Sequence, residues 1–304
     1  MTQPSEGEVR HITVDGGYRV WTKRVGHGPV TLLLLHGGPG CTHEYFECFE
    51  NWLSPDEYTF YYYDQLGSHY SDQPDDPSLW TVERFREEVE QVRAGLGLED
   101  FYLFGNSWGG MLGTEYALKY GRHLRGLIVS NMTASIASYM RYINELRDRM
   151  DPEEVAVMKR HEAEGTLDDP EYQALLTGLY NRHICRVVPW PGPVARMFEH
   201  LALPVYHTMQ GPNEFVVTGT FRDWDRWADL HRLTVPTLLS VGRHDSMDPA
   251  DIEEMGRRIP NSRVSICENG SHLSMWDDPE TYFTALKGFL AEVEEARPAT
   301  ATSG

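Results

Sequence analysis

The chain has 304 residues, which fits one large domain, or one domain with an inserted subdomain, and suffices to bury a substantial core. Its hydrophobic content of 40% and aromatic content of 12% exclude an intrinsically disordered protein. The formal net charge of −19 disfavours nucleic acids and anionic membrane surfaces as partners.

The N-terminal segment MTQPSEGEVRHITVDGG lacks the basic start and apolar run of a secretory signal, and no stretch of roughly 18 uncharged apolar residues follows. We therefore expect a soluble, cytoplasmic protein. The four cysteines (Cys41, Cys48, Cys185 and Cys267) have neither the spacing of a metal site nor the density of a disulfide scaffold. They are interpreted as reduced packing residues.

The strand pattern begins with an antiparallel hairpin, because apolar and polar residues alternate on both sides of 15–17, the Asp-Gly-Gly turn. Six apolar runs of strand length follow, at 30–38, 58–67, 101–107, 124–132, 236–245 and 262–270. Such continuous apolar strands are typical of a parallel sheet that is buried on both faces.

Helical patterns lie between these strands. The segment 81–97 has one apolar stripe, formed by Phe85, Val89, Val92 and Leu96. The same helical pattern occurs in 108–121 and 279–296. Strands that alternate with helices predict an α/β fold. Between about Thr133 and Leu230 only helical patterns occur, in 135–150, 151–165, 169–188 and 192–211.

The long helical stretch predicts a cap inserted between two strands of the sheet. The expected organisation is a core made of 1–132 and 231–295, a cap over 133–230, and a disordered tail over 296–304. The predicted fold class is thus α/β, with a mostly parallel sheet, an antiparallel N-terminal hairpin and an inserted helical cap.

Ser107 lies between two glycines in FGNSWGG, directly after a strand pattern and before a helical one. Strand, GxSxG turn and helix together indicate a nucleophile elbow, in which side chains at 105 and 109 would collide with neighbouring backbone. A bare GxSxG match would be weak evidence. In this context we interpret Ser107 as a nucleophile.

A serine nucleophile needs a base, which in this architecture follows it in the chain. His272, in the loop after the last predicted strand, fits best among 13 histidines. The base needs a carboxylate, and Asp245 ends the preceding strand. Its rivals are Asp248, better interpreted as a helix N-terminal residue, and Asp223 or Asp225 in the cap. His244 is interpreted as structural or substrate-lining.

The developing oxyanion requires two preorganised N–H donors. One is the backbone amide of Trp108, directly after the nucleophile. The second is expected from the loop after an earlier strand, where HGGPG (36–40) allows close backbone approach, and we choose Gly38.

The motifs HGGPG, DQLG, GNSWGG, GPNEF, GRHD and GSHLSMW occur in this order, and with them the chain resembles the proline iminopeptidase family of α/β-hydrolase serine peptidases from about residue 10 to 293. The resemblance implies a capped α/β-hydrolase core, no metal or organic cofactor, and release of an N-terminal residue from small peptides or amino acid amides with a free amino group. It assigns Ser107 as nucleophile, Asp245 as acid, His272 as base, and the Gly38 and Trp108 amides as oxyanion donors.

The resemblance also implies that Glu214, in GPNEF, binds the free α-ammonium of the substrate. Two departures affect specificity. Ser246 stands where several relatives carry a second amine-binding glutamate, so binding of the substrate amine is expected to be weaker. Leu66 and His69 replace an arginine and a glycine of the family pattern, near the mouth of the site in the family.

Three functions are compatible with this pattern: a serine exopeptidase or amidase, an esterase or specialised amide hydrolase with the same triad, and a catalytically silent ligand-binding protein. The complete set of candidate residues favours an enzyme. The cap aromatics Trp190, Tyr206, Phe215 and Trp224 fit a pocket for a proline ring and core packing equally well.

Overall fold

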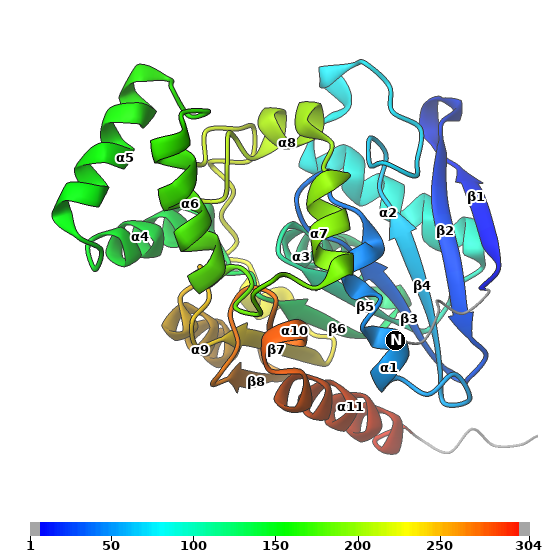
Figure 1. Ribbon diagram of the computed structural model, residues 1–304. Coiled ribbons are helices and arrows are strands. Elements are labelled where there is room, and N and C mark those ends of the chain that lie inside the picture. The colour runs from blue at the N-terminus through cyan, green and yellow to red at the C-terminus, as the bar shows by residue number, and fades with distance from the viewer. Residues whose placement is uncertain (1–6, 298–304) are drawn as a thin grey trace, which may run out of the picture.

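The computed structural model describes residues 7–297, which are built on an eight-stranded sheet with the order β1-β2-β4-β3-β5-β6-β7-β8 (Figure 1). The strands are β1 (Val9–Thr13), β2 (Arg19–Gly26), β3 (Val30–Leu35), β4 (Tyr58–Asp64), β5 (Phe101–Asn106), β6 (Leu124–Ser130), β7 (Thr237–Gly242) and β8 (Ser262–Cys267). β2 pairs antiparallel with both β1 and β4, and every other pairing is parallel. The predicted hairpin and fold class are confirmed. Most of the tail predicted as disordered, 298–304, lies outside the described residues.

Alternating side chains on the central strands face two hydrophobic layers. Leu32 and Leu34 of β3 belong to the layer of helices α1 and α11, whereas Leu33 and Leu35 belong to that of α2, α3 and α9. These helices span Phe49–Trp52 (α1), Val82–Leu96 (α2), Trp108–Tyr120 (α3), Pro249–Arg258 (α9) and Pro279–Glu295 (α11). Because both faces are covered, the central strands are apolar throughout.

Helix α2 shows how local sequence sets an element that covers the sheet. The Thr81 side chain accepts a hydrogen bond from the Arg84 amide at its start, and Gly97 ends it in a left-handed conformation with φ of 69°. Phe85 and Val89 of the predicted stripe are buried, as is Val92. The amphipathic pattern therefore identified the buried face.

The last strand, β8, corrects one expectation. The run 262–270 was predicted to be buried on both faces, but β8 pairs only with β7 and forms an edge of the sheet. Arg263 and Val264 are exposed there. An edge strand is covered less completely than the strands at the centre of a sheet.

Five helices are inserted between β6 and β7, as predicted, and they lie over the carboxyl ends of the central strands (Figure 1). They are α4 (Ile136–Arg147), α5 (Pro152–Glu164), α6 (Pro170–His183), α7 (Gly192–Glu199) and α8 (Leu203–Met209). The pattern at 192–211 divides into α7 and α8 rather than forming one helix. At this break the Ala202 amide donates to the Gly40 carbonyl of the core at 2.9 Å, which connects the inserted helices to the loop after β3.

The four cysteines are free and buried, as predicted. Cys41 differs from the other three because it lines the cavity described below. Burial raises the pKa of its thiol well above the usual value, with a further contribution from the charge of Glu214. The thiol is therefore neutral at physiological pH.

Candidate active site

Ser107 occupies the turn between β5 and α3 in a conformation that few residues other than glycine adopt, with φ of 56° and ψ of −126°. The turn is fixed by backbone hydrogen bonds: the Ser107 amide donates to Ser130 O at 2.9 Å, and the Gly110 amide donates to Ser107 O at 2.7 Å. A serine held at positive φ on a strand-to-helix turn is the geometry of a nucleophile elbow.

The two glycines that flank Ser107 are required by close backbone contacts. A Cβ at Gly105 would lie 2.0 Å from the Gly109 carbonyl oxygen, and a Cβ at Gly109 would lie 2.1 Å from the Leu35 carbonyl oxygen. Both contacts involve backbone, which cannot move aside as a flexible side chain can. The collision predicted from the sequence is thus present on both sides of the turn.

Asp245 and His272, which follow β7 and β8, form a buried pair. His272 Nδ1–H donates to Asp245 Oδ1 at 2.8 Å, and both residues are almost completely buried. The Met247 amide also donates to Oδ1, at 3.0 Å. The carboxylate therefore fixes the imidazole with its other nitrogen, Nε2, available for proton transfer.

Asn131, which the sequence reading missed, holds the second oxygen of Asp245. Its Nδ2 donates to Asp245 Oδ2 at 2.6 Å and to Ser271 O at 3.1 Å, while its Oδ1 accepts from Asn106 Nδ2 at 3.3 Å. Asn131 is completely buried and has a φ of 56°. Since Asn106 precedes Ser107, this side chain connects the elbow to the carboxylate. Its position just after β6 was the only feature of the sequence that could have indicated a place in the site.

The rival candidates lie elsewhere. Asp248 caps α9 by accepting a hydrogen bond from the Ala250 amide at 3.0 Å, as predicted. Asp223 is exposed, and Asp225 accepts from the Trp227 amide at 2.9 Å. His244 does not line the cavity beside Ser107, and its carbonyl accepts from His183 Nδ1 at 2.9 Å. Of its two predicted roles, the structural one agrees with this position.

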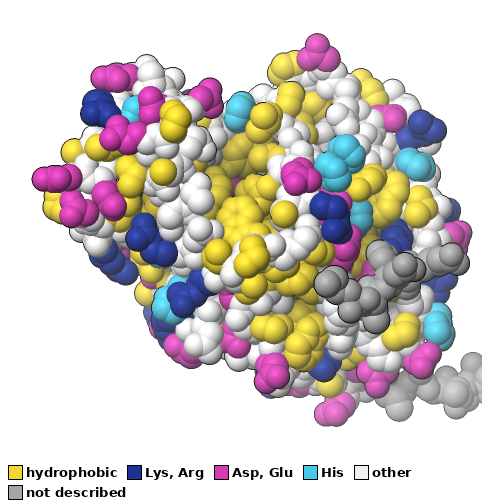
Figure 2. Space-filling view, viewed as in Figure 1, with side chains coloured by type: hydrophobic (Ala, Val, Ile, Leu, Met, Phe, Trp, Pro, Cys, Tyr) yellow, Lys and Arg dark blue, Asp and Glu magenta, His cyan; other side chains and the backbone are white. Residues whose placement is uncertain are grey.

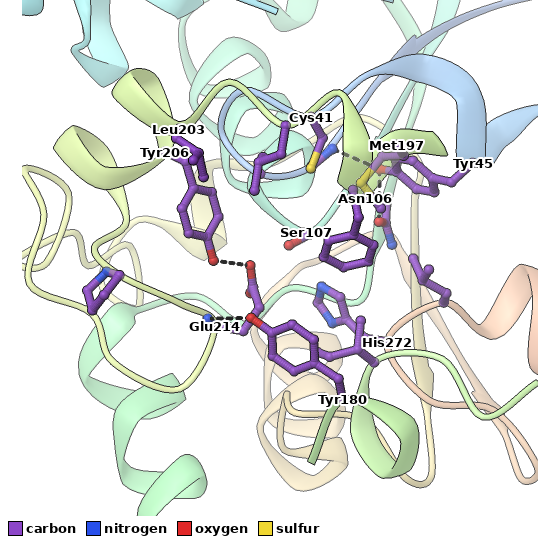
Figure 3. Close-up of a pocket in the computed structure, with 17 residues that line it drawn as sticks. Cys41, Tyr45, Asn106, Ser107, Tyr180, Met197, Leu203, Tyr206, Glu214 and His272 are labelled. Carbon is purple, nitrogen blue, oxygen red and sulfur yellow. Dashed lines mark hydrogen bonds between the residues drawn. The ribbon is translucent and has the colours of Figure 1, made fainter. Parts of the chain in front are cut away.

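Ser107 and His272 line one cavity of about 110 Å³ (Figure 3). His272 Nε2 is buried and has no hydrogen-bond partner among the described residues, Ser107 included. Figure 3 shows the two side chains on adjoining walls of this cavity. Serine and base are often not hydrogen-bonded in unliganded enzymes and come together when substrate binds.

The two proposed oxyanion donors border the same space. Gly38 lines the cavity with a φ of 107°, and the Gly37 amide beside it is already engaged with the Tyr45 hydroxyl at 2.7 Å. Trp108 is the first residue of α3, where a backbone N–H has no partner within the helix. Its indole N–H donates to Gln65 at 2.8 Å.

Glu214 enters this cavity from the inserted segment after α8, among tyrosines (Figure 3). The Tyr206 hydroxyl donates to Glu214 Oε1 at 2.6 Å, and Tyr139 donates to the Glu214 carbonyl. The Glu214 amide donates to the Tyr180 hydroxyl at 3.3 Å. The resemblance singled out Glu214, whereas nothing in the sequence indicated Tyr139 or Tyr180.

The protonation of Glu214 and His272 is coupled. Burial raises the pKa of Glu214, while the charge of His272 and the hydrogen bond from Tyr206 lower it, and the net pKa lies above its usual value. Burial lowers the pKa of His272, but the charge and hydrogen bond of Asp245 and the charge of Glu214 raise it further, so the net pKa lies above 6.5. The pocket thus favours the imidazolium that forms during acyl transfer.

The residues that depart from the family pattern do not face the cavity. Ser246 is buried behind it, and its hydroxyl lies 3.3 Å from Asp245 Oδ1 and 3.5 Å from His272 Nδ1. Leu66 is buried in the core and does not line the cavity. His69 is exposed and lines a separate, neighbouring cavity. Among the cavity-lining residues, Glu214 is therefore the only carboxylate.

Of the four cap aromatics named from the sequence, Tyr206 alone lines the cavity. Phe215 and Trp224 are buried in the core cluster, and Trp190 packs against Tyr180 with ring centroids 6.4 Å apart. Within residues 7–297, no cluster of three or more His, Cys, Asp or Glu side chains is arranged to hold a metal ion. In the same range, no helix has the length and apolar character needed to cross a bilayer.

These features define an α/β hydrolase, and residues 30–279 match a family model described as the alpha/beta hydrolase fold. The chain is 44% identical over 287 residues to a proline iminopeptidase from Flavobacterium johnsoniae, covering 93% of this chain and 97% of the relative. It is 45% identical over 285 residues to one from Elizabethkingia meningoseptica, covering 92% and 96%. The chain belongs to the proline iminopeptidase family.

Solved structures agree with this assignment. A proline iminopeptidase from Mycobacterium smegmatis is 32% identical with a TM-score of 0.88, and the match covers 95% of this chain and 99% of that one. VinJ is 35% identical with a TM-score of 0.89, and the match covers 96% and 100%. Similarity therefore extends through the core and the inserted helices alike.

Proposed function

We propose that this protein is a serine exopeptidase that releases an N-terminal residue, proline or another small or apolar amino acid, from peptides or amino acid amides. The observation that carries the proposal is the 2.8 Å Asp245–His272 pair, whose free imidazole nitrogen borders the cavity of Ser107. The 32–45% identity to proline iminopeptidases supports the same activity.

In the proposed mechanism, Ser107 Oγ attacks the scissile carbonyl while its proton passes to His272 Nε2. The amides of Gly38 and Trp108 stabilise the negative charge on the carbonyl oxygen. Collapse of the tetrahedral intermediate breaks the C–N bond, and the leaving amine takes the proton from His272. Water, activated by His272, then hydrolyses the acyl-enzyme and regenerates Ser107.

Glu214 is proposed to bind the free α-ammonium of the substrate. A carboxylate in a largely apolar cavity interacts strongly with a cation, and its position beside Ser107 would limit cleavage to the first peptide bond. The hydrogen bond from Tyr206 holds Glu214 Oε1 in place. Substrates without a free amine are therefore expected to react poorly.

A panel of proline, alanine and phenylalanine arylamides and simple acyl esters tests the proposal. We expect cleavage of arylamides with a free amine, little cleavage of their N-acetylated forms, and a loss of at least about 1000-fold in Ser107→Ala. The matched control is Ser78→Ala, an exposed serine outside the cavity. A fluorophosphonate that fails to label Ser107 in the folded protein would contradict the proposal.

An esterase or specialised amide hydrolase is the second candidate. It is favoured by one observation: Ser246 leaves Glu214 as the only carboxylate that lines the cavity. A single carboxylate selects a cationic amine less strictly than two. Cleavage of simple acyl esters without detectable cleavage of any free-amine arylamide would support this alternative.

A further inference from the structure

A second cavity, of about 510 Å³, lies beside the candidate active site between the core and the inserted helices. It is lined by residues of 67–80 from the loop after β4 and by 199–205 from the segment joining α7 and α8, and we call it the side cavity. Ser107, Glu214 and His272 do not line it. Leu201 and Leu203 line both cavities and therefore form the wall between them.

The size of the active-site cavity requires most of a peptide substrate to lie outside it. A volume of about 110 Å³ has room for roughly eight to ten water-sized groups, which corresponds to a single amino-acid residue. The residues after the scissile bond must therefore leave this cavity. Leu203, which borders both cavities, is 51% exposed and gives them a shared apolar rim.

The side cavity has a preorganised aromatic surface. The rings of His69 and His200 stack with centroids 3.8 Å apart and an interplanar angle of 12°. His200 Nδ1–H donates to the buried carboxylate of Glu44 at 2.8 Å, which fixes its ring in place. Figure 2 shows histidine side chains grouped on this face of the molecule, near α7. His69 is exposed and lines the side cavity.

Another part of the lining is shaped by close packing between the loop after β4 and α8. A Cβ at Gly67, which has a φ of 87°, would lie 2.6 Å from Val205 Cγ2 and 3.0 Å from the Trp80 ring. Glycine at this position therefore lets α8 approach the loop closely. The side cavity is thus built by specific contacts between the two parts of the chain.

The charge of the side cavity disfavours anions. Asp75 and Glu199 line it and are both exposed, whereas its lining includes no lysine or arginine from the described part of the chain. A cationic group would be attracted by both carboxylates, and an acidic group would be repelled.

We propose that the side cavity binds the leaving-group side of peptide substrates, favouring aromatic or cationic residues after the scissile bond and disfavouring acidic ones. This inference rests on the proposed function, because it concerns the substrate of that same site. It gives His69, a departure from the family pattern, a role in substrate selection outside the chemical step.

The first test compares a short and a long leaving group in His69→Ala. With prolinamide, whose leaving group is ammonia, kcat/KM should stay within about twofold of the wild-type value, whereas with the peptide amide Pro-Phe-Lys it should fall roughly fivefold through the lost stacking contact. His231→Ala, an exposed histidine outside both cavities, is the matched control and should change neither value. Equal effects of His69→Ala on both substrates would overturn the inference.

The second test concerns charge. At low salt, the wild-type protein should cleave Pro-Phe-Lys amide several-fold faster than Pro-Phe-Glu amide. The double variant Asp75→Asn/Glu199→Gln should lose most of this preference. Salt at about 0.5 M should have the same effect on the wild-type protein, because it screens the two carboxylates. Equal rates for the two peptides at low salt would overturn the inference while leaving the proposed function intact. Failure of the wild-type protein to cleave prolinamide and both peptides would overturn both.

Discussion

The two sides of the candidate active site are built differently. On the core side, the Asp245 carboxylate accepts hydrogen bonds from His272, Asn131 and Met247, and Ser107 is held by backbone contacts. On the cap side, the Glu214 carboxylate accepts a hydrogen bond from Tyr206, and apolar side chains form most of the remaining wall. The comparison suggests that the core side performs the chemistry and that the cap side selects the substrate.

The largest expected loss of activity follows from a substitution on the core side. Asp245→Asn would place an amide beside the Asn131 donor and favour the wrong imidazole tautomer, so kcat should fall about 10⁴-fold on every substrate, esters included. Steady-state kinetics on an arylamide and an ester measures this. The control is Asp248→Asn, because asparagine also caps helices well and activity should stay within about twofold. A loss of activity confined to amine-bearing substrates would contradict the division into a core side for chemistry and a cap side for substrate selection.

The cap-side counterpart is Glu214→Gln. It should raise KM for substrates with a free amine about 100-fold, or ~3 kcal/mol of binding, and leave an ester without an amine nearly unchanged. Glu145→Gln, which removes a partly exposed cap carboxylate outside the cavity, is the control. Equal losses on the ester and the arylamide would show that Glu214 serves the chemical step.

Asn131→Ala sharpens the comparison within the core side. Without the 2.6 Å hydrogen bond to Asp245 Oδ2, a buried charged oxygen loses its donor, and kcat should fall about 10- to 100-fold with little change in KM. Thermal unfolding must be measured alongside, since kinetics well below the midpoint separates positioning from instability. An unchanged kcat in folded protein would contradict a positioning role.

The smallest expected effect is on the pH profile. The acid limb of kcat/KM should lie above pH 6.5, because the net pKa of His272 is raised and activity is lost as the imidazole becomes protonated. Glu214→Gln removes one of the charges that raise this pKa, so the limb should move to lower pH. An ester without an amine is the suitable substrate. A shift to higher pH would contradict the electrostatic coupling of the two sides.

Local sequence predicted much of the fold because the relevant forces act over short distances. The apolar runs of β3 to β7 and the stripe of Phe85, Val89 and Val92 were interpreted correctly, since a strand covered on both faces is apolar throughout and a helix covered on one face repeats apolar residues every 3.6 positions. The glycines beside Ser107 were predicted because their contacts involve neighbouring strand and helix backbone. The exposed edge strand β8 was missed, as an apolar run does not report its place in the sheet.

The fold class, the turn at Ser107 and the order in which Asp245 and His272 follow it can be inferred from the sequence, because strand and turn chemistry are encoded within a few residues. The side chains that complete the site emerge only from the packing of the folded chain. Asn131 reaches Asp245 across 114 residues, and His200 stacks on His69 across the boundary between cap and core. Such contacts depend on how distant segments pack, which no local pattern records.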